Sequence, residues 1–250
     1  TGYRHIMVYR GDEGLDPTTT PPHDIMDEPI TSHLPRGKGR EYIIDLMERS
    51  SEVLEEHEVN EVRVDLQQNP ANMMWLWGQG ERSPMQPFRE RFHIDGAAIS
   101  AVNLVRGLAR LIGWKVIDVP GATAYLDTDY AAKGRHACDA LNNYDIVLVH
   151  VEAPDEAGHE GNLKGKIKAI ERVDSEIVGP VMSLADSLSD LRVLVLPDHY
   201  TRIDTRKHDP TPVPFLISGA GVPARMQRPF TEANAEASDL HVPYGHELME

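Results

Sequence analysis

Polar side chains with metal-ligand chemistry stand beside apolar runs in the C-terminal half of this 250-residue chain. Asp155 and His159 follow the run YDIVLVHV, while Asp198 and His199 follow RVLVLP. His208 stands just before PVPFLI. Carboxylate oxygen suits Mn²⁺ or Mg²⁺, and imidazole favours Zn²⁺, Mn²⁺ or Co²⁺. The five side chains are therefore a candidate ligand set for one or two divalent ions.

The elements that would position these residues alternate between strand and helix. Short apolar strands separated by amphipathic helices are typical of a largely parallel sheet covered on both faces. In such α/β sheets, ligands bind beyond the carboxyl ends of the strands, so we expect the polar clusters to meet there. The sequence predicts a doubly wound α/β fold with strands at 115–119, 145–151, 192–196 and 213–218, and helices at 128–142 and 162–187.

The N-terminal part follows a different pattern. Its apolar residues predict a helix over 40–59, and alternation predicts strands over 3–11 and 60–67. A further apolar strand that runs into turn residues is expected within 72–88, and a long loop rich in Pro, Gly, Thr and Asp precedes the helix. We place a domain boundary near residue 95. This gives a smaller α/β domain over 1–95 and the larger metal-binding domain over 96–250.

Composition restricts the partners. The formal net charge is −15, from 25 basic and 40 acidic residues, which argues against nucleic acid or an anionic membrane as partner. A small anionic substrate needs only a local basic pocket. The single cysteine, Cys138, allows no internal disulfide and fits a reducing compartment, so we expect a cytoplasmic protein. No apolar run approaches the roughly 18 residues of a spanning helix.

Several stretches together resemble a known family. PDEAGH followed by GNLKGKIKAIERVD, then VLPDH, then a histidine four residues before PVPFLI, resemble the metal-binding half of the alkaline phosphatase superfamily. YRHIMV, TPPHDI, ANMMWLWGQG, ISAVNLVRGLARLIG and VPGATAYLDTDYAAKG resemble its cofactor-independent phosphoglycerate mutases of the archaeal type. The resemblance covers nearly the whole chain and implies an alkaline-phosphatase-like fold with a smaller α/β insert domain.

The resemblance also implies a two-metal site and a phosphoserine intermediate. Mn²⁺ is the favoured metal, with Mg²⁺, Zn²⁺ or Co²⁺ as alternatives. By position, one ion would be held by Asp155, His159 and His208, and the other by Asp198 and His199. In that family the second ion is completed by an aspartate and by the nucleophilic serine, both expected upstream of the first residue here. The resemblance therefore indicates an N-terminally truncated chain that lacks its nucleophile.

The substrate of that family carries a phosphate and a carboxylate, for which arginine and imidazole groups are suitable partners. Residues 1–95 resemble the family's substrate-binding insert domain. The candidates are Arg4, His5, His23, Asp24 and Arg106. Each also has a purely structural interpretation: Arg4 and His5 could alternate on a half-exposed strand, His23 and Asp24 could form only a turn, and Arg106 could be a solvated helix residue.

The leading hypothesis is a metal-dependent mutase that interconverts 2- and 3-phosphoglycerate. A related phosphotransferase or phosphatase, for example a homoserine-kinase-like enzyme, would share the metals and differ within residues 1–95. A non-catalytic metal-binding fragment is a third possibility, because the chain has no Gly-x-Ser-x-Gly elbow and no phosphate-binding P-loop, and Ser100 lies in an apolar run. An ordinary α/β domain with capping residues would bind no metal. The oligomeric state is open.

Overall fold

The computed structural model of the chain describes residues 5–11, 14–25, 27–81 and 83–249. It divides the chain into two compact units, Thr1–Pro84 and Met85–Glu250. The boundary therefore lies before α3 (Phe88–Phe92), whereas the sequence boundary near residue 95 assigned this helix to the first part. Among the described residues, no helix combines the length and the apolar character needed to cross a bilayer.

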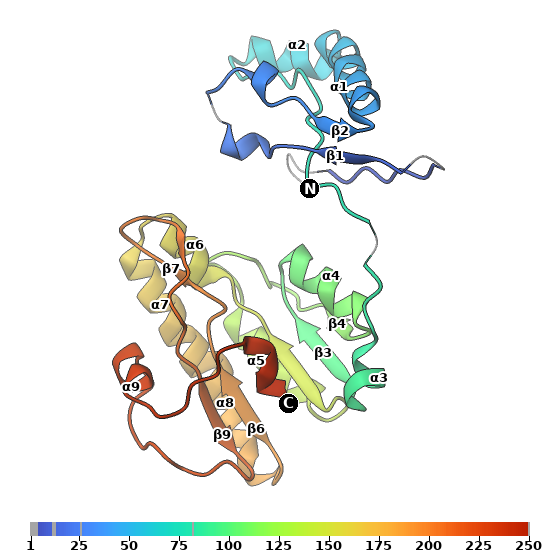
Figure 1. Cartoon of the computed structure of the whole chain (residues 1–250). Helices are drawn as coiled ribbons and strands as arrows, with labels where there is room; N and C mark the ends of the chain where they lie inside the picture. Colours follow the sequence, from blue (N-terminus) through green and yellow to red (C-terminus); the bar gives the residue numbers. More distant parts are fainter. Residues whose placement is uncertain (1–4, 12–13, 26, 82, 250) are drawn as a thin grey trace. The chain divides into compact units, whose positions relative to one another are not determined.

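The first unit contains a small antiparallel strand pair and two helices (Figure 1). The long helix buries Ile43 and Met47, which lie four residues apart on one helical face. Its observed bounds agree with the helix expected over 40–59, except for its last turn. The elements are β1 (Asp16–Thr18), the 3₁₀ turns η1 (Pro22–Asp24) and η2 (Ile30–Ser32), β2 (Arg36–Lys38), α1 (Arg40–Glu55) and α2 (Glu58–Asp65).

The strand expected over 60–67 is wrong, because these residues lie largely in α2. The His57 side chain accepts a hydrogen bond from the backbone N–H of Val59 and caps the start of this helix. Val62 and Val64 are both more than half exposed, so the alternating apolar residues cover no core. Alternation of apolar residues predicts a strand only where one face of the segment is buried. Here the alternating apolar residues are exposed, and the segment forms a helix capped by His57.

The strands expected over 3–11 and within 72–88 are also wrong for the described residues. Residues 5–11 and the described part of 72–87 have no regular secondary structure, and Ile6 is 94% exposed. An extended segment becomes a strand when a neighbour accepts and donates its backbone hydrogen bonds, and none of the described residues does so here. Instead, Trp75 Nε1 donates to the Thr20 carbonyl.

Asn60 joins α2 to the segment that follows it. Its side-chain amide donates to the carbonyls of Leu54 and Ala71, both at 2.6 Å, and its oxygen accepts from Ala71 N at 2.8 Å. We expect Asn60→Ala to lower the unfolding free energy of this unit by about 2 kcal/mol, because buried groups lose their partners. Hydrogen exchange of the α1 and α2 amides measures the change. The same substitution at exposed Asn72 is the control, and equal protection in both variants would contradict the expectation.

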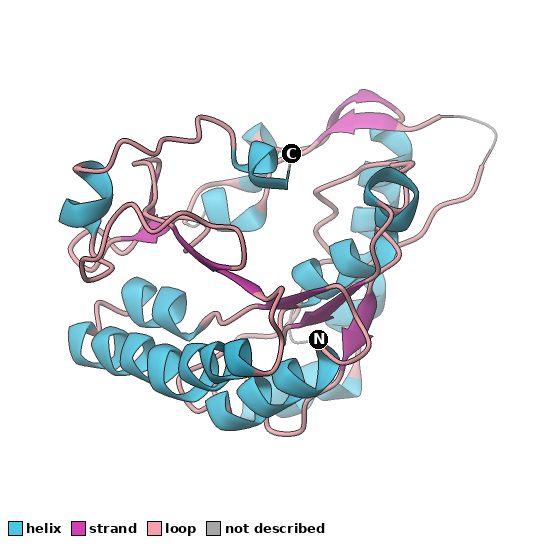
Figure 2. Cartoon of the chain, turned by 90° about the horizontal axis from the view of Figure 1, so that it is seen from below, coloured by secondary structure: helices cyan, strands magenta, loops and turns pink. Residues whose placement is uncertain are grey.

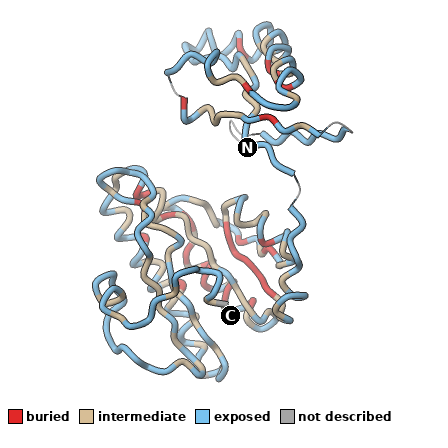
Figure 3. The backbone as a smooth tube through the Cα atoms, in the orientation of Figure 1, coloured by how far each residue is buried: buried red, intermediate tan, exposed pale blue. Residues whose placement is uncertain are grey.

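The second unit is built on a parallel sheet. β3 (Gly96–Ile99) lies between β4 (Lys115–Ile117) and β5 (Ile146–Val149), with both neighbours parallel to it. The sequence predicted the two outer strands but not β3, the central one. Its sequence, GAAI, is short and made largely of small residues, although every residue in it is buried (Figure 3).

Helices cover both faces of this sheet (cyan in Figure 2). On one face Ala98 packs with Ala109 of α4 (Asn103–Leu111) and with Val116. On the other face Ile99 packs with Ala132 and Ala137 of α5 (Tyr130–Ala140). The small side chains of β3 let both helices approach closely. The prediction of an α/β fold with a doubly covered parallel sheet is confirmed.

The last two expected strands are present but pair differently. β6 (Arg192–Val195) and β9 (Leu216–Gly219) form an antiparallel pair of their own. A parallel pair requires a crossover connection, usually a helix, and residues 196–215 contain none. Between β6 and β9 lies instead a second antiparallel pair, β7 (Tyr200–Thr201) with β8 (His208–Asp209).

The helical pattern predicted over 162–187 is present as one long run with a change of pitch. α7 (Leu163–Val173) passes into the π-helical segment η3 (Asp174–Val178), then α8 (Gly179–Met182) and the 3₁₀ turn η4 (Ser183–Asp186). α6 (Ala153–His159) precedes it. After β9 come α9 (Glu232–Glu236) and the 3₁₀ turn η5 (Gly245–Met249).

Candidate metal centre

α6 begins directly after β5 and carries two of the candidate ligands. Pro154 stands in its first turn, where a missing backbone N–H costs nothing. Asp155 also lies in the first turn and His159 in the last, so the carboxylate faces the positive end of the helix dipole and the imidazole the negative end. Their spacing of four residues places both on one face, with His159 Nε2 at 3.3 Å from Asp155 Oδ2.

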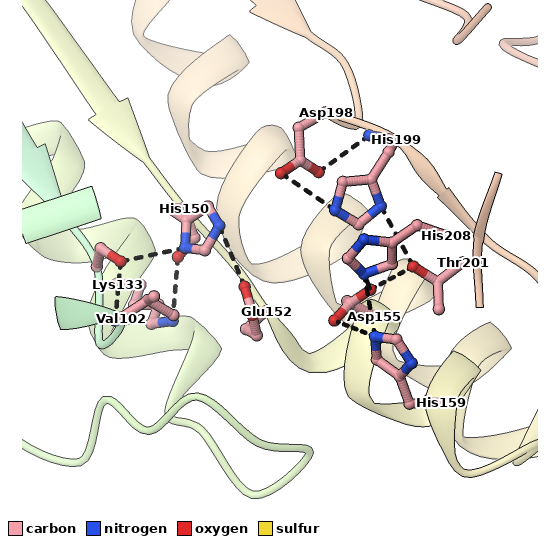
Figure 4. Close-up of polar contacts among 11 residues, drawn as sticks. Val102, Lys133, His150, Glu152, Asp155, His159, Asp198, His199, Thr201 and His208 are labelled. Carbon is pink, nitrogen blue, oxygen red and sulfur yellow. Dashed lines mark hydrogen bonds and ion pairs between the residues drawn. The ribbon is translucent and has the colours of Figure 1, made fainter. Parts of the chain in front are cut away.

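The other three candidates reach the same place from the segment between β6 and β9. Asp198 and His199 follow β6, and the His199 backbone N–H donates to Asp198 Oδ1 at 3.1 Å. His208 opens β8 and lies directly opposite Thr201 in the register of the β7–β8 pair. This hairpin brings His208 back toward α6, which explains how a residue far along the chain joins the cluster (Figure 4).

The candidate side chains converge closely. His208 Nε2 lies 3.5 Å from Asp155 Oδ1 and 3.1 Å from His159 Nε2. The His199 and His208 rings stack with centroids 3.8 Å apart, and His199 Nε2 is 3.6 Å from Asp198 Oδ2. Ligand atoms of Asp155, His199 and His208 all lie within 4.8 Å of one another. The structure thus brings together all five residues that the sequence singled out, and their role as ligands stays a prediction.

The hydrogen bond at the far side of His159 indicates which ring nitrogen faces the cluster. Nδ1 lies 2.9 Å from the Arg206 carbonyl, which can only accept, so Nδ1 is the protonated nitrogen. In the neutral ring Nε2 then carries a lone pair, and it points at Asp155 and at His208 Nε2. Lone pairs and carboxylate oxygens directed at one another are the arrangement that a cation stabilises, so the donor set fits a divalent ion.

Further acidic groups adjoin the cluster. Ligand atoms of Glu152, Asp155 and Glu156 also lie within 4.8 Å of one another. Burial raises the pKa of the Glu152 carboxyl, and the charges of Asp155, Glu156 and Asp198 raise it further. Glu152 is close to His150, whose Nε2 lies 3.3 Å from its Oε2. The local field at this edge of the sheet is therefore negative, which favours cations.

Three buried residues that the sequence did not propose as ligands lie beside the cluster, and one of them, Thr201, contacts a candidate ligand directly. Lys133 of α5 is 1% exposed and donates to the His150 carbonyl at 3.3 Å; burial lowers the pKa of its ammonium group. Ser100, at the end of β3, lies 3.1 Å from His150 Nδ1 through its hydroxyl. Thr201 donates its hydroxyl hydrogen to Asp155 Oδ1. The apolar runs beside the candidate ligands identified these residues in the sequence. Hydroxyl and lysine side chains are too common in sequences for Thr201, Ser100 or Lys133 to be recognised in the same way.

The candidate substrate residues lie in different surroundings. Arg4 is outside the described residues, and His5 is exposed. His23 and Asp24 lie in η1, where the His23 ring meets the Trp77 ring edge-on with centroids 5.2 Å apart. Arg106 belongs to the second unit and is not a freely solvated helix residue. It donates to the Ser100 carbonyl at 3.2 Å and to Asp118 Oδ1 at 2.6 Å, and this ion pair lowers the pKa of Asp118.

Comparison with known proteins gives a consistent result. The family model described as Metalloenzyme superfamily matches residues 17–242. A 2,3-bisphosphoglycerate-independent phosphoglycerate mutase of Methanothrix thermoacetophila is 48% identical over 99% of this chain and 63% of its own length. A solved protein from Pyrococcus horikoshii is 32% identical, with a TM-score of 0.71 over 79% of this chain and 51% of its own. A cofactor-independent phosphoglycerate mutase from Thermoplasma acidophilum, 24% identical over 93% of this chain and 57% of its own, shares the fold with a TM-score of 0.60.

The chain is shorter than these relatives. It spans 62–63% of the length of the first three curated relatives that it matches. The matched region covers 99% of this chain and so includes the candidate metal centre. Residues that the relatives carry outside the matched region have no counterpart in this sequence.

Proposed function

Because this chain belongs to the Metalloenzyme superfamily, we propose that it forms the metal-binding part of a phosphoglycerate mutase. The reaction would interconvert 2- and 3-phosphoglycerate through a phosphoserine intermediate. The observation that carries the proposal is the convergence of two carboxylates and three imidazoles from α6, from the segment after β6 and from the β7–β8 hairpin. The 48% identity to a protein named as such a mutase supports the substrate class.

In this proposal the cluster holds two divalent ions. Asp155, His159 and His208 would hold one, and Asp198 and His199 the other; Mn²⁺ suits this mixture of oxygen and nitrogen best, with Mg²⁺, Zn²⁺ and Co²⁺ as alternatives. Bound there, the ions would lower the pKa of a serine hydroxyl and stabilise a phosphoryl group in transfer. We expect that serine from a part of the protein outside this chain, so the 250 residues alone should be inactive.

The residues of the chain would bind and orient. His159, whose Nδ1 is held by the Arg206 carbonyl, would present the lone pair of Nε2 in its neutral form. The first unit would hold the glycerate part of the substrate, with Arg4, His5, His23 and Asp24 as candidates. Arg106 would act from the second unit, where its guanidinium is held by Asp118. An arginine already fixed by a carboxylate loses little rotational freedom on meeting an anion, which favours a binding role.

The substrate class, location and partners of the protein are part of the same proposal. We expect a small anionic phosphorylated substrate, and a cytoplasmic protein that binds neither nucleic acid nor membrane. The net charge of −15 and the single cysteine support this expectation.

The test is exchange between 2- and 3-phosphoglycerate by the whole protein with Mn²⁺. We expect measurable exchange, and a loss of at least about 100-fold in His159→Ala, because a metal ligand should matter at least as much as the groups that support ligands. His241→Ala, at an exposed histidine outside the cluster, is the control. If the whole protein with Mn²⁺ performs no exchange, the substrate assignment is wrong. If His159→Ala retains full activity, the metal assignment is wrong.

A further inference from the structure

The hydroxyl of Thr201 lies between the two proposed ligand sets. We propose that Thr201 is a positioning residue that fixes the orientation of Asp155 and the tautomer of His199, so that both present unprotonated ligand atoms to the metal centre. The inference rests on the proposed metal-binding function and concerns how this chain prepares its ligands.

The location of Thr201 explains why it can act on both sets. It is 4% exposed and ends β7, directly opposite His208 in β8. Its Oγ1 donates to Asp155 Oδ1 on α6 and lies 3.3 Å from His199 Nδ1 (Figure 4). One hydroxyl therefore contacts a residue proposed for the first ion and a residue proposed for the second.

Counting hydrogens determines the direction of each bond. A threonine hydroxyl has one hydrogen to donate and lone pairs to accept with, whereas an ionised carboxylate can only accept. The hydrogen of Thr201 therefore goes to Asp155, and the contact with His199 forms only if His199 Nδ1 carries the hydrogen and donates it. The Tyr200 carbonyl, 3.4 Å from the same Nδ1, is a second acceptor that favours this tautomer.

The consequence lies at the opposite nitrogen of the ring. With the hydrogen on Nδ1, His199 Nε2 carries a lone pair, and it lies 3.6 Å from the acceptor oxygen Oδ2 of Asp198. Two acceptors facing each other are the arrangement that a cation relieves. His159 has the same arrangement, with Nδ1 bound to the Arg206 carbonyl and Nε2 toward the cluster. Both imidazoles are then prepared in the same way on opposite sides of the centre.

Packing holds Thr201 in place. A side chain added at Gly158 of α6 would lie 2.8 Å from Thr201 Cγ2 and 2.8 Å from its carbonyl oxygen, so the helix and β7 are in direct contact there. From α7, Lys166 donates to the same carbonyl at 2.6 Å. Lys166 is thus partly buried and bonded rather than exposed on the helix surface. Contacts from two helices leave the hydroxyl little freedom to turn away from Asp155.

Nuclear magnetic resonance of the metal-free 250-residue chain tests the tautomer directly. The ¹⁵N shifts of a neutral imidazole distinguish the protonated nitrogen from the unprotonated one. We expect His199 to carry its hydrogen on Nδ1 in the original chain, and to lose this preference in Thr201→Val. A hydrogen on Nε2 of His199 in the original chain would overturn the inference, whatever the metal measurements give.

Mn²⁺ titration of the same chains tests the consequence. Thr201→Val keeps the shape of the side chain and removes the hydroxyl, and we expect its Mn²⁺ affinity to fall about 10- to 100-fold. Thr201→Ser restores the hydroxyl and should restore most of the affinity. Thr128→Val is the matched control, because Thr128 is 1% exposed and its hydroxyl accepts from Thr123 N away from the cluster. It should lower thermal stability and leave the Mn²⁺ affinity unchanged.

The outcomes separate the two proposals. If the original chain binds no Mn²⁺, the metal centre is wrong and the role of Thr201 falls with it. If the original chain binds Mn²⁺ and Thr201→Val binds equally well, only the positioning role is wrong. If Thr201→Ser is as weak as Thr201→Val, shape rather than the hydroxyl matters, and the inference is again overturned.

Discussion

Asp155→Asn is expected to lower the affinity of the chain for Mn²⁺ by more than about 100-fold, beyond the range for groups that only support ligands. Asp155 is the residue on which the cluster is centred. Its two oxygens lie near His208 and His159, and it belongs to both groups of side chains that could hold an ion. An amide has nearly the shape of the carboxylate but no charge, and its nitrogen cannot bind a cation.

Without metal, Asp155→Asn is expected to raise the stability of the chain or to leave it unchanged. Burial and then the charge of Asp155 raise the pKa of Glu152, so the two carboxylates repel each other when no cation is bound. Removing one negative charge should leave the unfolding temperature of the metal-free chain unchanged or higher. Added Mn²⁺ should then stabilise the original chain, by about 2.7 kcal/mol at a hundred times its dissociation constant, and the variant hardly at all.

Calorimetric titration together with thermal unfolding checks both parts. Asp190→Asn, the same change of charge at an exposed residue outside the cluster, should retain the original affinity. An Asp155→Asn chain that binds Mn²⁺ within tenfold of the original would show that the carboxylate is not a ligand. A large fall in metal-free stability would show that Asp155 acts mainly through its bonds to neighbouring residues.

The second half of the fold was predictable because its signals are strong. The runs around Val147 and Val193 are apolar, short and bounded by turns, and each is found as a strand. The rule that ligands bind beyond the ends of parallel strands placed Asp155 and His159 after β5, whereas Asp198, His199 and His208 reach the same place from the antiparallel β6–β9 and β7–β8 pairs. The antiparallel return of β9 did not follow, because direction depends on the connection, and the β7–β8 hairpin carries too few residues to be recognised in the sequence.

The first half was harder to predict because its local patterns are not supported by burial. Val62 and Val64 alternate like strand residues, yet they lie in a helix whose start is capped by His57 and whose first turn is bonded to Ala71 through Asn60. In the second unit, the strand β3 was missed for the opposite reason. It is buried, but a strand made largely of Gly and Ala has little β propensity. Its burial comes from the helices that pack on it together with the neighbouring strands.

Gly134→Ala is expected to lower the unfolding free energy of the second unit by about 3 kcal/mol, at the upper end of what overpacking usually costs. A Cβ at this position in α5 would lie 2.1 Å from the Glu176 carbonyl oxygen and 3.3 Å from Ile177 Cα. Both are backbone atoms of the π-helical segment η3, so no side chain can turn aside to make room.

A neighbouring contact joins α5 to the helical run that contains η3. Arg172 binds Glu176 through two bonds of 2.6 and 3.0 Å, and its guanidinium lies over the Tyr130 ring at 4.2 Å. Tyr130 is fully buried at the start of α5. Relieving the clash at Gly134 would therefore require α5 to move away from η3, which would break the stacking of Arg172 on Tyr130.

Gly107→Ala is the matched control, because it makes the same change in α4, where an added Cβ meets no atom within 4 Å. There the substitution should stabilise the chain by about 0.5–1 kcal/mol, since alanine favours a helix and restricts the unfolded chain. Denaturant unfolding of the two variants should give shifts of opposite sign. Equal stabilisation by both would mean that the π-helical segment can move away from α5, and that the tight crossing of these two elements does not contribute to the stability of the unit that carries the metal centre.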